Sequence, residues 1–167
     1  MTYAGSTSPR TARFPIAIGH PTELRAFAYA GDPIAIPDND QTGISIPFAV
    51  SGIGKASKVT FSVDGTDCSA TEGSTTVGIN HTYVGDLVGT LKAPSGATAV
   101  VFGNSGGSGN NMCKVVFDDT ASKPFKGISA DLAPYTGTWR PAEPFANLLG
   151  NADGTWTFTL KDTAGQD

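Results

Sequence analysis

Serine chemistry is the first catalytic possibility in this chain, because Gly103-Asn104-Ser105-Gly106-Gly107 fits the pattern G-x-S-x-G. In hydrolases with this pattern the serine stands between a strand and a helix, which aim its hydroxyl and supply backbone donors. Here the motif is followed by Ser, Gly, Asn and Asn and then by an apolar run, so no helix can form behind the serine. We therefore predict a glycine loop at this position and no nucleophile.

A general base would have to be one of two histidines, His20 or His81. His20 precedes a proline near the N-terminus, and His81 lies within a predicted strand. Neither has a serine or cysteine at the spacing of a known motif, although a triad assembled in space stays open. A lone histidine in a strand is usually structural. We predict that the chain is not an enzyme.

Aspartates outnumber glutamates by twelve to three. Aspartate prefers turns and helix caps, so turn chemistry explains most of this excess. The alternative is Ca²⁺, which takes six to eight oxygen ligands from loops. The candidate metal ligands are Asp38, Asp40, Asp118 and Asp119, at the ends of predicted strands. No spacing typical of a calcium loop decides between solvated turn caps and a calcium site.

Two further groups of residues leave alternatives open. Cys68 and Cys113 are compatible with one disulfide or with two buried thiols, and no CxxC motif indicates zinc. Tyr135 and Trp139 could form a surface platform for a sugar ring, or they could cover the core. We favour packing for these aromatic residues, and keep a carbohydrate- or surface-binding β-sandwich as the alternative function.

Composition excludes several partners. The formal net charge is −4 and only 16% of the residues are charged, which argues against nucleic acid, because binding there depends on lysine and arginine. No apolar run reaches the roughly 20 residues of a membrane helix, so we expect no membrane insertion. The 167 residues suit one domain. We place a loose leader at residues 1–13 and a single domain at 14–167.

Alternating apolar and polar residues, separated by glycine and proline, predict eight or nine short strands. This pattern is typical of an all-β jelly roll or β-sandwich. The predicted strands are Leu24 to Ile36, Ile44 to Val50, Lys58 to Asp64, Thr75 to Val84, Leu87 to Ala93, Thr98 to Phe102, Met112 to Phe117 and Thr155 to Lys161. A turn is expected at Pro94-Ser95-Gly96, and a long irregular segment at Thr120 to Asn151.

The order of these motifs resembles the P domain, or Homo B domain, of kexin- and furin-like proprotein convertases and bacterial subtilisin-like proteases. The resemblance covers Ile34 to Asp167. The matching residues are Ile36-Pro37-Asp38-Asn39-Asp40, His81, Gly85-Asp86-Leu87, Leu91, Pro94-Ser95-Gly96, Phe117-Asp118-Asp119, the segment Tyr135 to Pro144, and Gly154-Thr155-Trp156 through Leu160 to Asp162.

The resemblance implies a jelly-roll fold and a non-catalytic accessory module in a secreted or cell-surface protein. The implied partner is a subtilisin-like protease catalytic domain, against which the module packs and which it stabilises. It also implies that Asp86 anchors a turn by accepting backbone N–H bonds, and that His81 has no catalytic role.

One departure from the family pattern concerns the last strand. Family members continue past the Gly-Thr-Trp strand to a further strand, whereas this sequence ends at Asp167. A missing strand leaves backbone groups of its neighbour unpaired. Either the sequence stops short of that strand or another segment fills its position. Leu24 to Tyr29 resembles the strand, and under the second alternative it would fill the position in a permuted arrangement.

Overall fold

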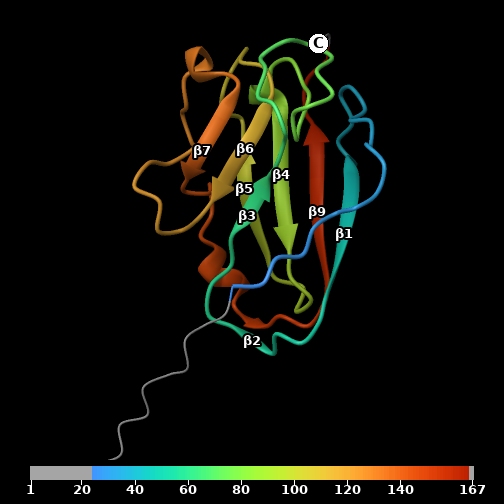
Figure 1. Cartoon of the computed structure of the whole chain (residues 1–167), viewed down its shortest axis with the longest axis vertical. Coiled ribbons are helices and arrows are strands. Elements are labelled where there is room, and N and C mark those ends of the chain that lie inside the picture. Colours follow the sequence, from blue (N-terminus) through green and yellow to red (C-terminus); the bar gives the residue numbers. More distant parts are fainter. Residues whose placement is uncertain (1–23, 166–167) are drawn as a thin grey trace, which may run out of the picture.

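The computed structural model describes residues 24–165, in which strands follow one another with only three short 3₁₀-helices between them (Figure 1). The all-β prediction is confirmed. The strands are β1 (Ile44–Val50), β2 (Lys55–Ala56), β3 (Phe61–Val63), β4 (Leu87–Lys92), β5 (Thr98–Gly103), β6 (Met112–Phe117), β7 (Tyr135–Trp139), β8 (Gly150–Asn151) and β9 (Gly154–Asp162). The 3₁₀-helices are η1 (Val84–Asp86), η2 (Ala130–Leu132) and η3 (Phe145–Leu148).

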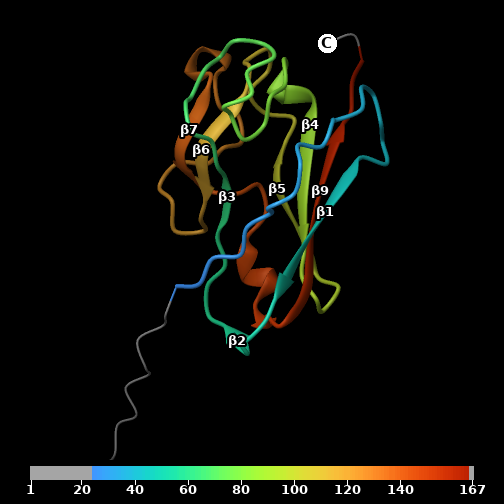
Figure 2. The same ribbon diagram turned by 45° about the vertical axis from the view of Figure 1, so that its right-hand side comes forward.

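Two sheets form the body of the fold. The larger has the strand order β1-β9-β4-β5 and is antiparallel throughout. The smaller has the order β3-β6-β7, in which β6 and β7 run parallel. Figures 1 and 2 show the smaller sheet lying across one face of the larger one. The short pair β2 and β8 lies at one end.

Strand β9 shows why this sequence folds as a sandwich. Its residues Trp156, Phe158 and Leu160 are buried, whereas the intervening threonines Thr157 and Thr159 are partly exposed. Successive side chains of a strand point to opposite faces, so this alternation makes one face apolar. That face has to be covered by a second layer.

Aromatic rings from the two sheets meet between the layers. Phe61 of β3 stacks on Phe158 of β9 with ring centroids 4.4 Å apart, and Phe102 of β5 lies 5.5 Å from Phe117 of β6. Phe125, in the connection after β6, packs edge-on against Phe117. Stacked and edge-on pairs of this kind add to the free energy gained from burial.

The predicted turn between β4 and β5 is confirmed. Ala93 donates to Ala97 at 2.8 Å, and Gly96 donates to Ala93 at 2.9 Å. Gly96 has a φ of 91°, a left-handed conformation that glycine adopts without a steric penalty. The turn therefore sets the register of the β4–β5 hairpin.

Two predicted strands are wrong. Residues 24–36 form no strand; they cross the molecule as an exposed segment, which we call the strap. Residues 75–84 form only isolated bridges, Gly65 with Val77 and Ile79 with Met112, so His81 does not lie within a strand. Strand β9 already pairs with β1 and β4, and Leu24 to Tyr29 does not fill a place beside it.

The segment predicted to be irregular, residues 120–151, is more ordered than expected. It contains β7, which joins the smaller sheet in parallel, and the helices η2 and η3. The β7 sequence Tyr-Thr-Gly-Thr-Trp has little apolar alternation, so only its pairing with β6 defines it. The predicted leader at residues 1–13 and His20 lie outside the described residues. None of the helices in residues 24–165 is long and apolar enough to span a membrane.

Candidate functional site

Ser105 is held inside its loop. Its hydroxyl donates to the Gly103 carbonyl at 3.0 Å and accepts from the Gly127 backbone N–H at 3.3 Å, and the residue is only 6% exposed. These contacts join the glycine loop to the connection that follows β6. The serine has a structural role in this arrangement, as its sequence context predicts.

A histidine and an aspartate from distant parts of the chain meet in a concavity of about 250 Å³. The His81 Nε2 atom lies 3.2 Å from an Asp162 carboxylate oxygen. The side chain of His81 is 11% exposed and that of Asp162 only 1%. Asp38 and Glu72 also line the concavity.

Both ring nitrogens of His81 face groups that only accept hydrogen bonds. Nε2 faces the Asp162 carboxylate, and Nδ1 faces the carbonyl oxygen of Thr82. A neutral imidazole has one N–H, so donating from both nitrogens requires the protonated ring. His81 and Asp162 form an ion pair when the imidazole ring is protonated. Both ring nitrogens of His81 thus have partners within the chain.

The pair belongs to a larger polar network. The second carboxylate oxygen of Asp162 accepts from Ala164 N at 3.1 Å. The His81 backbone N–H donates to the fully buried side chain of Asn111 at 3.0 Å. Asn111 in turn donates to the carbonyls of Ser69 and Thr71, at 2.8 and 2.9 Å. The network ties the loop at residues 64–82 to β6 and to the end of β9.

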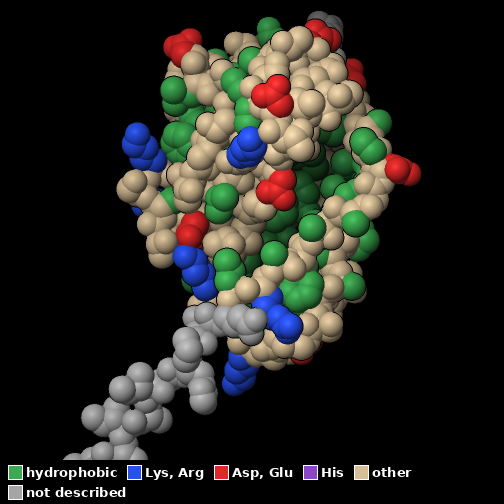
Figure 3. Space-filling view, in the orientation of Figure 1, with side chains coloured by type: hydrophobic (Ala, Val, Ile, Leu, Met, Phe, Trp, Pro, Cys, Tyr) green, Lys and Arg blue, Asp and Glu red, His purple; other side chains and the backbone are tan. Residues whose placement is uncertain are grey.

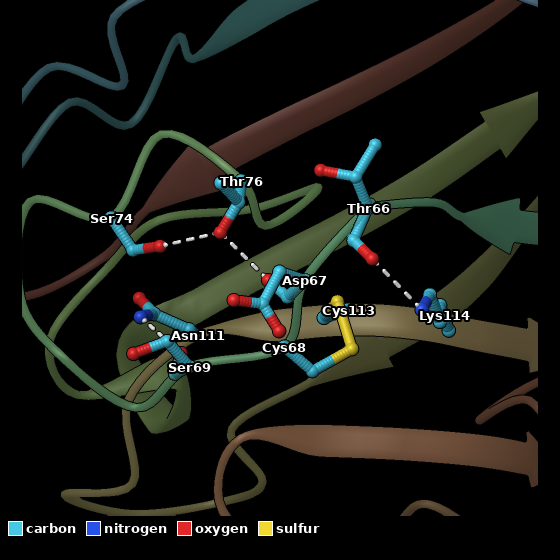
Figure 4. Close-up of a disulfide and its surroundings, with 9 residues drawn as sticks. All are labelled: Thr66, Asp67, Cys68, Ser69, Ser74, Thr76, Asn111, Cys113 and Lys114. Atoms are coloured by element: carbon cyan, nitrogen blue, oxygen red, sulfur yellow. Dashed lines mark hydrogen bonds between the residues drawn. A yellow bond between two sulfur atoms is a disulfide. The ribbon is translucent and has the colours of Figure 1, made fainter.

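A disulfide fastens the same loop. Cys68 and Cys113 are bridged, which decides the alternative left open by the sequence (Figure 4). Beside the bridge, Lys114 Nζ donates to the Thr66 carbonyl at 3.0 Å, and the Thr76 hydroxyl donates to the Asp67 carbonyl at 2.7 Å. A loop without strands is thereby held by side chains. A disulfide of this kind is consistent with an oxidising, extracellular compartment.

The four aspartates predicted as calcium ligands have separate surroundings. Asp40 accepts from Thr42 N at 2.8 Å, while Asp38 is exposed beside the concavity. Asp118 pairs with Lys58 Nζ at 2.6 Å, and this hydrogen bond holds the pKa of Asp118 below its usual value despite some desolvation. Within residues 24–165 no three acidic, histidine or cysteine side chains form a group suited to a metal ion. Calcium binding at these aspartates stays a prediction.

Asp119 joins two distant segments. Its two carboxylate oxygens accept from Phe145 N at 2.8 Å and Ala146 N at 2.9 Å, at the start of η3. Backbone N–H groups at the beginning of a helix have no partner within the helix, so a carboxylate there acts as a cap. Asp119 is thus a capping residue in the folded chain.

Replacing Asp119 by alanine is expected to lower the free energy of unfolding by about 1–2 kcal/mol, because two backbone donors lose their acceptor. Urea unfolding followed by tryptophan fluorescence measures the change. Replacing the exposed Asp64 by alanine is the matched control and is expected to change the midpoint little. Equal effects of the two substitutions would contradict the capping role.

The turn at Asp86 is anchored differently from the prediction. The Asp86 backbone carbonyl accepts from Thr163 N at 2.9 Å and from the Thr163 hydroxyl at 2.6 Å, and its N–H donates to the Tyr83 carbonyl. The predicted anchor was the carboxylate, whereas these bonds are made by the backbone. Gly85 allows the chain to approach closely here, since a Cβ at this position would lie 2.7 Å from Gly107 Cα.

The aromatic platform is not present. Tyr135 is fully buried and donates its hydroxyl proton to the Gly106 carbonyl, so the prediction of a surface contact for Tyr135 is wrong. Trp139 is partly buried, packs edge-on against Phe125 and donates its indole N–H to Thr136 at 2.7 Å. Both residues serve packing, which was the favoured alternative.

Burial raises the pKa of Tyr135, and the nearby negative charge of Asp131 raises it further. In the unfolded chain a tyrosine ionises near pH 10, whereas folded Tyr135 resists ionisation. The free energy of unfolding is therefore expected to fall as the pH rises above about 10. Urea unfolding between pH 8 and 10.5 measures this decline. Tyr135→Phe should reduce the pH dependence, and the exposed-site control Tyr29→Phe should not.

Two important side chains, Asp153 and Asn111, were not singled out from the sequence, and a third, Asp162, was named only as the end of a strand in the family pattern. Asp153 accepts from Ile53 N and Gly54 N, Asn111 fills the centre of the polar network, and Asp162 pairs with His81. Their partners are 30 to 100 residues away in sequence. The excess of aspartate was a signal for Asp153 and Asp162, and it indicates turn caps without naming their partners.

The fold and its polar side chains define an all-β, disulfide-linked scaffold in which the candidate catalytic groups have structural partners. In sequence the chain is similar to leupeptin-inactivating enzyme 1 of Streptomyces exfoliatus, with 28% identity over 134 residues. The match covers 80% of this chain and 22% of that enzyme, so it is distant and partial. No family model and no solved structure matches the chain.

Proposed function

We propose that this chain is a non-catalytic accessory module of a secreted protease, and that it packs against and stabilises the catalytic domain. The observation that carries the proposal is the partial match, which aligns most of this chain with about a fifth of a much longer enzyme. An accessory region of a larger enzyme gives such a match. The motif resemblance points to a subtilisin-like serine protease domain as the neighbour.

The geometry supports a role without bond chemistry. The two ring nitrogens of His81 are engaged, and Ser105 is hydrogen-bonded within its loop. A module of this kind acts through the surface that it buries against its neighbour. We expect the module to make the enzyme more resistant to unfolding. The disulfide between Cys68 and Cys113 suits a protein in an oxidising medium.

Two measurements test the proposal. The coding sequence next to this chain in its source is expected to encode a protease catalytic domain on one side. A stalk or an array of surface repeats in its place would contradict the proposal. The purified chain is expected to hydrolyse neither casein nor leupeptin. Turnover that is lost in His81→Ala, with the circular dichroism spectrum unchanged, would overturn the non-catalytic assignment.

A further inference from the structure

The larger sheet has an outward face that the smaller sheet does not cover. The smaller sheet lies on the opposite face, toward which Trp156, Phe158 and Leu160 of β9 point. Directly paired residues share a face, so the strand register defines the outward positions. We call them the threonine face. Its members are Ser45, Pro47, Ala49, Val88, Thr90, Lys92, Thr98, Val100, Gly103, Thr155, Thr157, Thr159 and Lys161.

The charges on the threonine face have one sign. Its charged residues are Lys92 and Lys161, and no aspartate or glutamate occupies an outward position of these four strands. The whole sequence nevertheless has 15 acidic and 11 basic residues. On the side of the molecule that Figure 3 shows, by contrast, both acidic and basic side chains occur. An anionic chain thus presents a cationic surface on this face.

A concavity of about 530 Å³ adjoins the threonine face beside β5. Val88 and Val100 of the face line it, and Lys126 lies at the same margin. Lys126 therefore adds a third ammonium group to Lys92 and Lys161. Within residues 24–165 no carboxylate lies within ion-pair distance of any of these three lysines. The surface combines an apolar hollow with cations that have no ionic partner in the part of the chain that the structure describes.

We propose, as a step that rests on the proposed function, that the threonine face and this concavity dock on the protease catalytic domain. The surface that they contact on that domain presents carboxylates. Three ammonium groups attract such a surface and speed the encounter. Glu143 lies nearby, at the edge of β5, and its carboxylate accepts from Val100 N at 2.7 Å instead of pairing with a lysine.

The side chains between the lysines suit a folded protein as the partner. Thr90, Thr157 and Thr159 are partly exposed. Their branched side chains have few rotamers, so covering them costs little conformational entropy. A linear polyanion would be bound by a row of basic residues, whereas neutral residues separate the lysines here. The face therefore fits separate carboxylates on a largely neutral protein surface.

The face is large enough for a stable contact. Its four strands, about 4.8 Å apart and about six residues long, make a surface of roughly 20 Å by 20 Å. Side-chain relief and the concavity raise the accessible area toward the roughly 800 Å² that one partner buries in a standard interface. A second copy of this chain is a poorer occupant, because a two-fold dimer would bring two lysine-bearing faces together.

The test uses the natural polypeptide that joins this chain to its neighbouring catalytic domain. The double variant Lys92→Glu, Lys161→Glu is expected to shorten the half-life of casein hydrolysis near the inactivation temperature by at least about threefold. Lys55→Glu, Lys123→Glu makes the same charge change at two exposed lysines of other surfaces and should not shorten it. In this chain alone, both double variants should melt within about 2 °C of the unmodified chain.

Cross-linking with a carbodiimide, which joins an amine to a carboxylate in contact, identifies the docked face. Mass spectrometry is expected to find Lys92, Lys126 or Lys161 joined to an aspartate or glutamate of the catalytic domain. Cross-links to the domain only through Lys55 or Lys123, or equal half-lives of the two double variants, would overturn docking by the threonine face and leave the proposed function in place.

Two further outcomes are distinct from these. If removal of this chain leaves the half-life of the catalytic domain unchanged, the proposed function is wrong, and docking by the threonine face is overturned with it. If this chain alone is a dimer that Lys92→Glu, Lys161→Glu converts to a monomer, the threonine face contacts a second copy, and docking on the protease domain is overturned.

Discussion

Replacing Cys68 and Cys113 together by serine is expected to lower the free energy of unfolding by about 4 kcal/mol. The bridge joins residues 45 positions apart, and a loop of that length restricts the unfolded chain considerably. Natural domains of this size have a total stability of about 5–15 kcal/mol. The double variant should therefore unfold at a much lower urea concentration, as followed by tryptophan fluorescence.

Reduction provides the control for this prediction. Dithiothreitol should lower the urea midpoint of the unmodified chain close to that of the double serine variant, and should leave the variant unchanged. Thiol titration of the unfolded, unreduced chain should find no free thiol. Two titratable thiols, or a midpoint insensitive to the reductant, would contradict a stabilising bridge.

The size of this effect follows from what the bridge holds. Residues 64–82 contain no regular strand and bury few apolar side chains, so the loop gains little from ladder bonds or core packing. Its order depends on the disulfide, on Asn111 and on the hydrogen bonds around Thr76. The disulfide and the two Asn111 hydrogen bonds join residues at least 40 positions apart, and they therefore restrict the loop as a whole.

Two predicted strands have the observed bounds: one alternates between partly buried and exposed residues, and the other is buried at most positions. Ile44–Val50 and Met112–Phe117 have the predicted bounds, because one face of each strand is packed on the core. The predictions for residues 24–36 and 75–84 failed because short apolar stretches there resemble strands locally but lack a partner strand to pair with. Strand β7 was missed for the opposite reason, since its pairing with β6 defines it and its own pattern does not.

The candidate site was predictable in its chemistry and not in its geometry. The excess of aspartate correctly indicated caps: Asp40, Asp118, Asp119, Asp153 and Asp162 all accept backbone N–H bonds. Where the acceptor and donor are two residues apart, as for Asp40 and Thr42, sequence alone suggests the contact. Where they are 100 residues apart, as for Asp153 and Ile53, only the fold brings them together.

Tyr135 illustrates the same limit for aromatic residues. Its sequence surroundings, with threonine and glycine on the C-terminal side, resemble an exposed loop. The parallel pairing of β7 turns the ring inward, where it packs edge-on against Phe125 with centroids 5.6 Å apart. The burial of Tyr135 therefore could not be predicted before the pairing of β7 with β6 was known.

Replacing His81 by leucine is expected to lower the free energy of unfolding by about 3–5 kcal/mol, because the Asp162 carboxylate is left buried without its imidazole partner. Asp162→Leu should also lower the free energy of unfolding, because the His81 ring loses its carboxylate partner. The network through Asn111 would lose its link to the end of β9 in either variant. Urea unfolding at constant pH and ionic strength measures both changes.

The double variant His81→Leu, Asp162→Leu separates the ion pair from the packing of the two side chains. With both charged groups removed, its destabilisation is expected to be smaller than the sum of the two single effects, and no unpaired charge remains buried. A coupling energy of about 1–3 kcal/mol would be typical for residues in direct contact. Strict additivity would show that the two side chains contribute independently, and would contradict the ion pair as the link between the disulfide loop and β9.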